Sequence, residues 1–432
     1  MREIKEITSQ IFDELNDLKA TKASFSVAQN EKKEFNVEGR QFTLMRTLFD
    51  NNISVNVWDG AKKGSASGND LSKEAVSDVV KTAYTSAQSA PDDPDFDIAP
   101  AQDKQTFRDG ALTPDIDKLY ERTNEMLETI SREYPQIMIY QCVVEYINSH
   151  SIYCNTNGTE FETYEGQYDI ILNFSANDGQ RNTGIDGTVV VSDNLDKPFI
   201  ECGDIRTHLE NCVAQLSEVP FSGKFEGTVV FTPGCLHQMI SYMVMNFMSD
   251  SVLIDDTSIW RDKLGEKVAS DKLTITSKPR DSRIVCGPHY NGDGFPADDV
   301  VYMEKGVLRK FNIGLYTANK KKLEPVQGCF QSIVIDNGDV PFADMIKSVK
   351  RGLLVGDFSG GTPSANGEIS GVAKSSFLIE DGVIKGAVSE TMINGNLAEM
   401  FNNIVAVSKE TVDNGMCVMP YMAIDKMVIS GK

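Results

Sequence analysis

Residues 227–250 read GTVVFTPGCLHQMISYMVMNFMSD, and this stretch decides how the second half of the chain is built. Its β-branched start predicts a strand, the Thr-Pro-Gly at 232–234 predicts a turn, and the apolar residues that follow predict a buried helix. A zinc-binding helix after such a strand carries two His side chains on one face and a Glu beside the first. Here Gln238 follows His237, and Ser241 stands one turn later. The stretch therefore has the build of a metal-binding helix without its ligands.

The composition indicates a folded protein of more than one domain. The 432 residues are 41% hydrophobic and 24% charged, which are ordinary values for a globular chain. A chain of this length exceeds what one hydrophobic core usually organises, so two or three domains are expected. The formal net charge of −21 repels phosphate backbones, and direct binding of nucleic acid is therefore not expected.

The sequence reads as that of a cytoplasmic protein. Its first residues, MREIKEITSQIFDELNDL, lack the apolar core of a signal peptide. The longest apolar stretch, residues 239–248, is far shorter than the roughly 20 residues of a membrane span. Eight scattered cysteines form no CxxC pair, so reduced thiols are expected. Cys212 stands four residues after His208 on a predicted helix, but with no second pair nearby, burial is a better interpretation than metal binding.

The patterning predicts the α+β class in two domains. An N-terminal domain, residues 1–220, is predicted as two helix-sheet units, 1–92 and 112–220, that repeat a loose order of helix, sheet and helix. Residues 90–100, APDDPDFDIAP, cannot continue a helix and read as a connector. From 221 to 432 glycine and short β segments predominate, which predicts a mainly antiparallel β domain.

Local signals place the individual elements. Turn residues at 50–52 and 59–60 predict that the first unit is a meander of short strands. The strands predicted there are 24–28, 41–49, 53–58 and 62–67. The helices predicted in the N-terminal domain begin near residue 4, run from about 70 to 89, and span 113–133 and 204–216. In the C-terminal domain, helices are predicted only at 235–248, 342–349 and 397–403, with Lys-Gly and Asp-Gly hairpins at 300–308 and 377–384.

Few residues suggest catalysis by the chain itself. It has four histidines, and no GxSxG elbow or comparable motif surrounds a nucleophile. Cys235 and His237 are two residues apart, so on a helix their side chains diverge and cannot pair. A loop conformation would let them meet, and an independent hydrolase that uses Cys235 or His237 is therefore kept as an alternative.

A glycine-rich segment at 355–362, VGDFSGGT, is a second candidate site. It lacks the Lys and the spacing of a phosphate-binding loop. Glycines at this density allow tight turns or the close approach of an extended peptide. Turn formation is the favoured interpretation, and peptide binding is the alternative.

Two longer motifs resemble a known family. Residues 63–72, KGSASGNDLS, and residues 387–397, AVSETMINGNL, which continue into NNIVAV at 402–407, are similar to the PmbA/TldE branch of the TldD/PmbA family, historically called modulators of DNA gyrase. The resemblance covers nearly the whole chain. It implies a cytoplasmic metalloprotease system that acts on peptides, in which a TldD-type subunit holds zinc on an HExxxH helix and a TldE-type subunit is its partner in a heterodimer.

The resemblance also indicates which positions have lost the metal site. When the zinc helix is laid on this chain by its preceding strand, Ser241, Tyr242 and Asn246 stand where the His, Glu and His would be. The catalytic subunit uses a cysteine near the C-terminus, and Cys417 matches that region, although one thiol cannot hold zinc. No catalytic residue, metal or cofactor is therefore expected on this chain, and zinc is expected on a TldD-type partner.

The expected role is that of a subunit that shapes the peptide path. An open strand edge could bind extended peptide, with the segments 289–296 and 357–362 as cleft walls. The candidate peptide-binding residues are His289, Asn291, Asp293, Asp357, Ser359, Gly360 and Gly361. A homodimer is possible when the chain is alone, and no membrane contact is expected. The alternatives are an independent hydrolase and a gyrase regulator that acts by protein binding.

Overall fold

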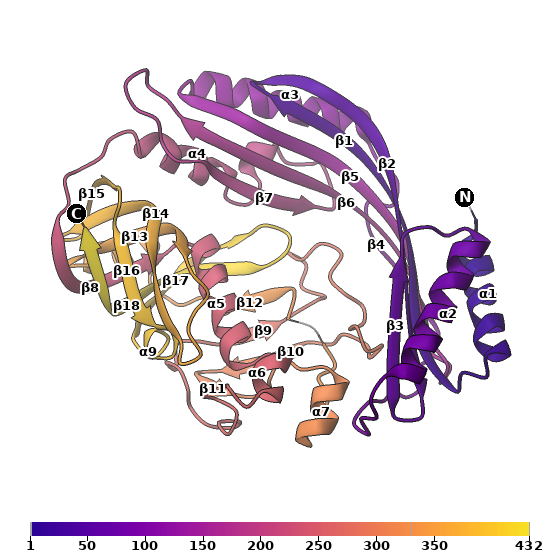
Figure 1. Ribbon diagram of the computed structural model, residues 1–432. Helices are drawn as coiled ribbons and strands as arrows, with labels where there is room; N and C mark the ends of the chain where they lie inside the picture. The colour runs from indigo at the N-terminus through magenta and orange to yellow at the C-terminus, as the bar shows by residue number, and fades with distance from the viewer. Residues whose placement is uncertain (1, 329, 432) are drawn as a thin grey trace.

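The computed structural model describes residues 2–328 and 330–431, which fold into two domains. In Figure 1 the N-terminal domain is a long curved sheet that arches over the C-terminal domain. Both domains combine helices with largely antiparallel sheets, so the predicted α+β class is confirmed. No helix in the described ranges has both the length and the apolar character needed to cross a membrane.

The N-terminal sheet is built from long, twisted strands. Among the described residues their order is β3-β2-β1-β5-β6-β4, with β7 also paired to β6. Only the β4–β6 pairing in this sheet is parallel. The strands are β1 (Lys22–Glu38), β2 (Gln41–Asp59), β3 (Lys62–Gly68), β4 (Gln105–Gly110), β5 (Ile137–Asn155), β6 (Glu160–Ala176) and β7 (Asp186–Ser192).

The helices of this domain cover one face of the sheet. Phe25 belongs to the core under the first two helices and Phe35 to the core under the next two. These two residues are ten apart on one strand, so they lie on the same face. The helices are α1 (Ile4–Asp17), α2 (Lys73–Ser89), α3 (Ile116–Glu133) and α4 (Ile205–Ala214), with a short 3-10 turn at Phe199–Glu201. The opposite face of β5 and β6 is left to contact the C-terminal domain (Figure 1).

One predicted turn is wrong, and another is confirmed. Residues 50–52 lie within the continuous strand β2, where Asp50 pairs with Asn30 and Asn52 with Ala28. The long ladder to β1 overrides the local turn preference of Asp and Asn, because every peptide group there gains a partner. At the end of β2, Gly60 has φ of 65° and makes the predicted turn into β3.

The C-terminal domain contains a ring of strands. Strand β8 pairs with β13, β13 with β14, β14 with β16, β16 with β18, and β18 again with β8. The pairings β8–β13 and β12–β18 are parallel, and the remaining ones are antiparallel. The strands are β8 (Gly223–Phe231), β9 (Ile275–Ser277), β10 (Val300–Glu304), β11 (Val307–Leu308), β12 (Ile333–Ile335), β13 (Arg351–Gly360), β14 (Glu368–Glu380), β15 (Val383–Val388), β16 (Met392–Asn396), β17 (Ile404–Asp413) and β18 (Val418–Gly431).

Helix prediction in this domain was incomplete. The helices observed are α5 (Pro233–Phe247), α6 (Asp250–Ile254), α7 (Leu315–Lys321), α8 (Phe342–Ser348) and α9 (Leu397–Met400). The prediction of only three helices was wrong, since α6 and α7 were missed. Each has seven residues or fewer, too short for a helical period to be read from sequence.

Both predicted hairpins are confirmed. Lys305 and Gly306 have φ of 47° and 76°, and Asp381 and Gly382 have φ of 49° and 74°. Two successive positive φ values give the turn a twist that matches the right-handed twist of the flanking strands. Local turn chemistry therefore fixed these two connections.

Candidate functional site

Helix α5 is fixed at its start by Thr232. The Thr232 hydroxyl donates a hydrogen bond to the Gly356 carbonyl at 3.1 Å and accepts one from the Cys235 amide at 3.5 Å. Pro233 occupies the first turn, where its missing N–H costs nothing. Apolar side chains of α5, including Leu236, Met239 and Ile240, are buried against the strands of the ring. This anchoring sets which face of the helix remains free.

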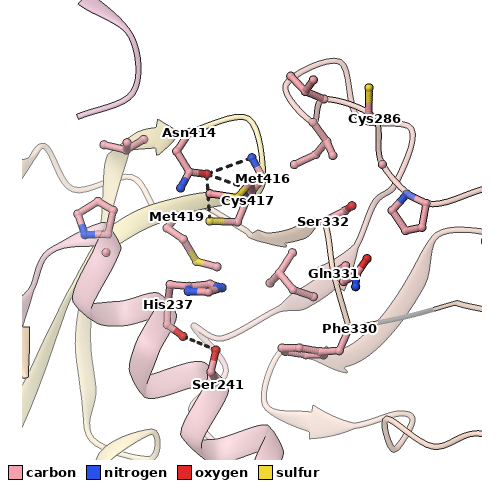
Figure 2. Close-up of a pocket in the computed structure, with 18 of the residues that line it drawn as sticks. His237, Ser241, Cys286, Phe330, Gln331, Ser332, Asn414, Met416, Cys417 and Met419 are labelled. Carbon is pink, nitrogen blue, oxygen red and sulfur yellow. Dashed lines mark hydrogen bonds between the residues drawn. The ribbon is translucent and has the colours of Figure 1, made fainter. Parts of the chain in front are cut away.

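The free face of α5 borders a cavity of about 540 Å³, called here the α5 cavity. His237 and Ser241, one turn apart, form the helix side of its wall. In Figure 2 both residues lie on α5, with Cys417 and Met419 across from His237. The remaining wall comes from Asp204 of the N-terminal domain and, in the C-terminal domain, from Pro233, Gly234, residues 284–288 and 330–333, Val412, Asn414 and Met416. The cavity therefore lies where the two domains meet.

The His237 imidazole and the Cys417 thiol of the α5 cavity are neutral, whereas its one carboxylate, Asp204, is bound to His208. Burial lowers the pKa of His237, which leaves its imidazole uncharged. Burial, assisted by Asp204 and Asp413, raises the pKa of the Cys417 thiol to about 12. The thiol lies 3.5 Å from Asn414 Oδ1, and the Ser241 hydroxyl donates to the His237 carbonyl at 2.9 Å. No activated nucleophile results from this arrangement.

These residues do not fit a catalytic zinc ion. Such a site needs three protein ligands and an acid or base for the bound water. The α5 cavity is lined by the possible ligands His237, Cys286, Cys417 and Asp204, and Asp204 is bound to His208. Within the described residues, however, only Asp109, Glu165 and His289 bring three such ligand atoms within 4.8 Å of one another. Gln238, the residue after His237, donates from Nε2 to the Phe358 carbonyl at 3.0 Å and so turns away.

The three positions laid on the zinc helix do not form one set. Ser241 borders the cavity, whereas Tyr242 packs edge-on against Phe358 with ring centroids 6.4 Å apart. Asn246 donates from Nδ2 to the Ser364 carbonyl at 2.6 Å. Beyond its first two residues, α5 faces the cavity with His237 and Ser241, which are four residues apart and share one side of the helix.

His289 lies in a charged cluster between the domains. Its Nε2 is 2.6 Å from Asp109 Oδ2, and its ring stacks on Phe107 with centroids 4.0 Å apart. Arg280 donates from Nη1 to the same Asp109 oxygen at 2.9 Å. Asp109, Glu165 and His289 each place a possible ligand atom within 4.8 Å of the others. The cluster combines two carboxylates with one guanidinium and one imidazole.

Asn291 and Asp293 shape the segment that carries His289. Asn291 is 7% exposed, and its Oδ1 accepts hydrogen bonds from the amides of Asp293 and Phe295. The Asp293 carboxylate accepts from the Leu315 amide at 2.8 Å, and its carbonyl accepts from the Tyr153 hydroxyl at 2.8 Å. The two side chains therefore hold the loop within the C-terminal domain, and the Asp293 carbonyl joins it to the N-terminal sheet. Neither residue borders the α5 cavity.

The glycine-rich segment is a strand and not a turn. Residues 355–360 belong to β13, where Asp357 pairs with Lys374 and Ser359 with Val372. The prediction of a turn was wrong because pairing to β14 uses these backbone groups. A Cβ on Gly360 would lie 2.5 Å from the Phe358 ring, so the glycine makes room for that side chain. Neither this segment nor Gly361 borders the α5 cavity.

The remaining predicted pairs are separated. Cys235 is 2% exposed, and burial raises its pKa well above the ordinary value, so it is no partner for His237. His208 is held by Asp186 at 2.9 Å and by Asp204 at 3.2 Å, whereas Cys212 contacts Thr183. The described cysteines are free, and Cys329 lies outside the described residues.

Several site residues had no sequence signal. Asp204 and Cys286 border the α5 cavity, and Asp109 and Glu165 surround His289, yet none stands in a recognisable motif. Asp109 and Glu165 meet because strands β4 and β6 pair, which places the two residues directly opposite each other. A register of that kind is set by the sheet and is not written in a short segment of sequence.

The chain thus combines a curved α+β domain with a β-ring domain and has a cavity beside α5 and β18. The sequence profile of the PmbA/TldA metallopeptidase C-terminal domain matches residues 222–431. A metalloprotease PmbA homolog of Haemophilus influenzae is 26% identical over 432 residues, covering 95% of this chain and 94% of that protein. Metalloprotease PmbA of Escherichia coli O157:H7 is 25% identical, covering 91% and 87%. Residues 222–431 thus match the C-terminal domain of the PmbA/TldD family, and the similarity to its metalloprotease members extends over nearly the whole chain.

Solved structures share the whole fold. TldE from Thermococcus kodakarensis aligns with a TM-score of 0.84 at 20% identity, covering 98% of this chain and 100% of that one. A protein of Bacteroides thetaiotaomicron, described as a putative modulator of DNA gyrase, aligns with a TM-score of 0.84 at 21% identity and covers all of both chains. At these identities the likeness shows the common architecture.

Proposed function

We propose that this chain is the noncatalytic subunit of a TldD/TldE-type metalloprotease, paired with a TldD-type subunit that holds the zinc. The observation that carries the proposal is the donor set of the α5 cavity. It offers one neutral imidazole, from His237, and two thiols that burial keeps protonated, from Cys286 and Cys417. Its one carboxylate, Asp204, is bound to His208, and no three of these groups come together as metal ligands within the described residues. The family that it matches is one of metalloproteases, so a chain with this donor set is best explained as a partner of an active subunit.

The α5 cavity is proposed to form part of the path taken by a peptide or a small unfolded protein. It lies between the domains and has apolar side chains such as Phe330, Met416 and Met419 in its wall. Met416 is 43% exposed, so apolar surface is already present for a ligand to cover. Because the cavity is preformed, the protein loses little conformational entropy when an extended peptide binds there.

A cytoplasmic location belongs to the same proposal. The described cysteines are free thiols, which is the usual state of cysteines in a reducing compartment. A role in direct DNA binding is not favoured, because the net charge of −21 opposes contact with phosphates. A gyrase regulator that binds protein, and an independent hydrolase, have no comparable support in the cavity's chemistry.

Reconstitution tests the proposal. The purified chain is dialysed against a chelator, reloaded with zinc and assayed on a denatured protein, alone and with a TldD-type subunit from the same host. We expect no stoichiometric zinc and no proteolysis by the chain alone, and chelator-sensitive proteolysis by the mixture. The mixture that contains His237→Ala should remain active and chelator-sensitive, because His237 is proposed to line the peptide path and not to hold the metal. Chelator-sensitive activity of the chain alone would overturn the proposal.

A further inference from the structure

A second cavity, of about 250 Å³, lies beside Glu165 and is called here the Glu165 cavity. It shares Cys286, Pro288 and Gln331 with the α5 cavity, so the two spaces lie on either side of the same residues. A chain occupying the α5 cavity therefore has a neighbouring space into which a side chain or a terminus can extend. The chemistry of that space determines what it can accept.

Two carboxylates approach this cavity, and only one is satisfied. Asp109 accepts from Arg280 at 2.9 Å and lies 2.6 Å from His289 Nε2. Glu165, its partner across β4 and β6, forms no hydrogen bond and no ion pair within the described residues. Its carboxylate lies within 4.8 Å of the Asp109 and His289 ligand atoms. Because two neighbouring carboxylates repel each other and Glu165 is half-buried, a bound cation would stabilise its charged form.

An independent observation concerns Thr163, which precedes Glu165 by two residues and shares its face of β6. Thr163 is 5% exposed and borders the same cavity. Its hydroxyl makes no hydrogen bond of normal geometry, although the Tyr290 phenol lies close to it. A buried hydroxyl without a well-formed bond is uncommon in a folded protein, and a ligand with N–H groups would complete it.

The Tyr290 ring completes the wall. It is stacked on Phe161 with centroids 5.1 Å apart, which fixes its position beside the cavity. Aromatic faces attract ammonium and guanidinium groups. The cavity thus combines the Glu165 carboxylate, the Thr163 hydroxyl, which lacks a well-formed hydrogen bond, and the Tyr290 ring.

We propose that the Glu165 cavity is a subsite for a positively charged group of the bound peptide, a Lys or Arg side chain or a free N-terminal ammonium. The inference rests on the proposed function, because it assumes that the α5 cavity carries peptide. Glu165 is then a specificity-determining residue that accepts hydrogen bonds from the cationic group, and the Thr163 hydroxyl is the nearest further acceptor on the same face of β6.

A divalent metal ion is a less suitable occupant. Two carboxylates and an imidazole are acceptable ligands for such ions. However, the Arg280 guanidinium lies 2.9 Å from Asp109 Oδ2 and 3.2 Å from His289 Nε2, the two atoms that a metal would need. The positive charge of Arg280 repels a divalent cation at Asp109 and His289. Glu165 faces the cavity and is not bound to Arg280 within the described residues.

Peptide binding to the purified full-length chain tests the subsite. Extended peptides with a C-terminal fluorophore and an acetylated N-terminus, identical except for one central Lys, norleucine or Glu, are compared by anisotropy at near-physiological salt. A fourth peptide carries norleucine and a free N-terminus, which separates the terminal ammonium from the side chain. We expect either the Lys peptide or the peptide with a free N-terminus to bind about tenfold more tightly than the acetylated norleucine peptide. A tenfold difference is the effect expected of one hydrogen bond between charged groups.

The decisive comparison uses two Glu→Gln variants of one strand. Glu165→Gln should reduce the preference for the cationic peptide to less than about twofold. Glu160→Gln, on the other face of β6, should retain it, because Glu160 pairs with Lys104 outside the cavity. Non-specific attraction to the acidic protein would be equal in both variants.

The subsite and the proposed function are contradicted by different results. A cationic preference that survives in Glu165→Gln, a wild type without any preference, or no peptide binding at all overturns the subsite. None of these outcomes decides the proposed function. That function fails instead if the chain does not activate a TldD-type subunit on the norleucine peptide, in which no charge is involved.

Discussion

Two helical histidines border the junction of the domains, and their surroundings are opposite. His208 of α4 is held between the carboxylates of Asp186 and Asp204. His237 of α5 faces the α5 cavity, where burial lowers its pKa and no hydrogen bond to its ring is found within the described residues. Burial alone would also discharge His208, but its two carboxylate partners outweigh that effect and raise its pKa to about 10. Partners, rather than burial, decide which imidazole carries charge.

The difference separates a structural role from a binding role. Asp186 also accepts a hydrogen bond from Ser375 of β14 at 3.2 Å, so the His208 group ties the N-terminal domain to the ring domain. His237 borders empty space that a peptide is proposed to occupy. A substitution of His208 should therefore lower the stability of the protein, whereas a substitution of His237 should change the surface of the α5 cavity.

The largest effect is expected for His208→Ala. It leaves Asp186 and Asp204, whose side chains are 8% and 16% exposed, without their cationic partner. Breaking a buried pair from one side costs about 3 kcal/mol of the free energy of unfolding. Urea denaturation of His208→Ala and His237→Ala would measure it. Equal losses in both variants would contradict the comparison.

The pH dependence of stability sharpens the same contrast. His208 has an ordinary pKa of 6.5 and a pKa of about 10 in the folded chain, so the folded state binds more protons between these values. The stabilisation by His208 is therefore complete below about pH 6.5 and is lost as pH rises towards 10. The difference in the free energy of unfolding between wild type and His208→Ala, measured across this window, should shrink as pH rises. A constant difference would exclude a charged His208.

A smaller effect is expected at the Glu165 subsite. Burial and the nearby Asp109, opposed by Arg280, raise the pKa of Glu165 to about 7. The other titratable groups that face it are Cys286, His289 and Tyr290. Because the carboxyl is neutral below this pKa and anionic above it, preference for a cationic peptide should increase from pH 6 to pH 8. The same titration on Glu165→Gln should be flat, and a preference that falls with pH in the wild type would refute the assignment.

The smallest effect concerns Cys417. Its pKa of about 12 leaves almost no thiolate at pH 8, and its exposed fraction is 9%. Thiol-specific reagents react with the thiolate, so Cys417 should be modified far more slowly than a free cysteine. Mass spectrometry of peptides after brief labelling would show this, with the more exposed Cys202 as the internal reference. Rapid labelling of Cys417 would indicate an activated thiol and favour a catalytic role for the α5 cavity.

Elements set by local chemistry were predictable from the sequence. Helix α2 begins at Lys73 behind the Ser72 cap and ends at Ser89, as its capping residue and period predict. The two hairpins follow from Lys-Gly and Asp-Gly turns. Predictions failed where long-range pairing opposed a local signal, as at residues 50–52 and in the glycine-rich part of β13.

The candidate site was only partly predictable for a similar reason. The absence of a second His and of a Glu on α5 is visible in the sequence, since His237 is followed by Gln238 and then by Ser241 one turn later. Which of these side chains faces a cavity depends on the side of α5 that packs against the ring. Tyr242 and Asn246 point to β13 and the segment after it, and no periodicity could distinguish them from Ser241.

By itself the sequence determined the α+β class, the family resemblance and the lack of a metal-binding pair on α5, because these depend on residue types at short spacing. Only the tertiary structure brought Asp109, Glu165 and His289 within 4.8 Å, placed Asp186 beside His208, and placed Asp204 at the α5 cavity. These groups come from strands, loops and helices far apart in the chain. Their charges are set by the partners that folding supplies, and a linear sequence does not contain those distances.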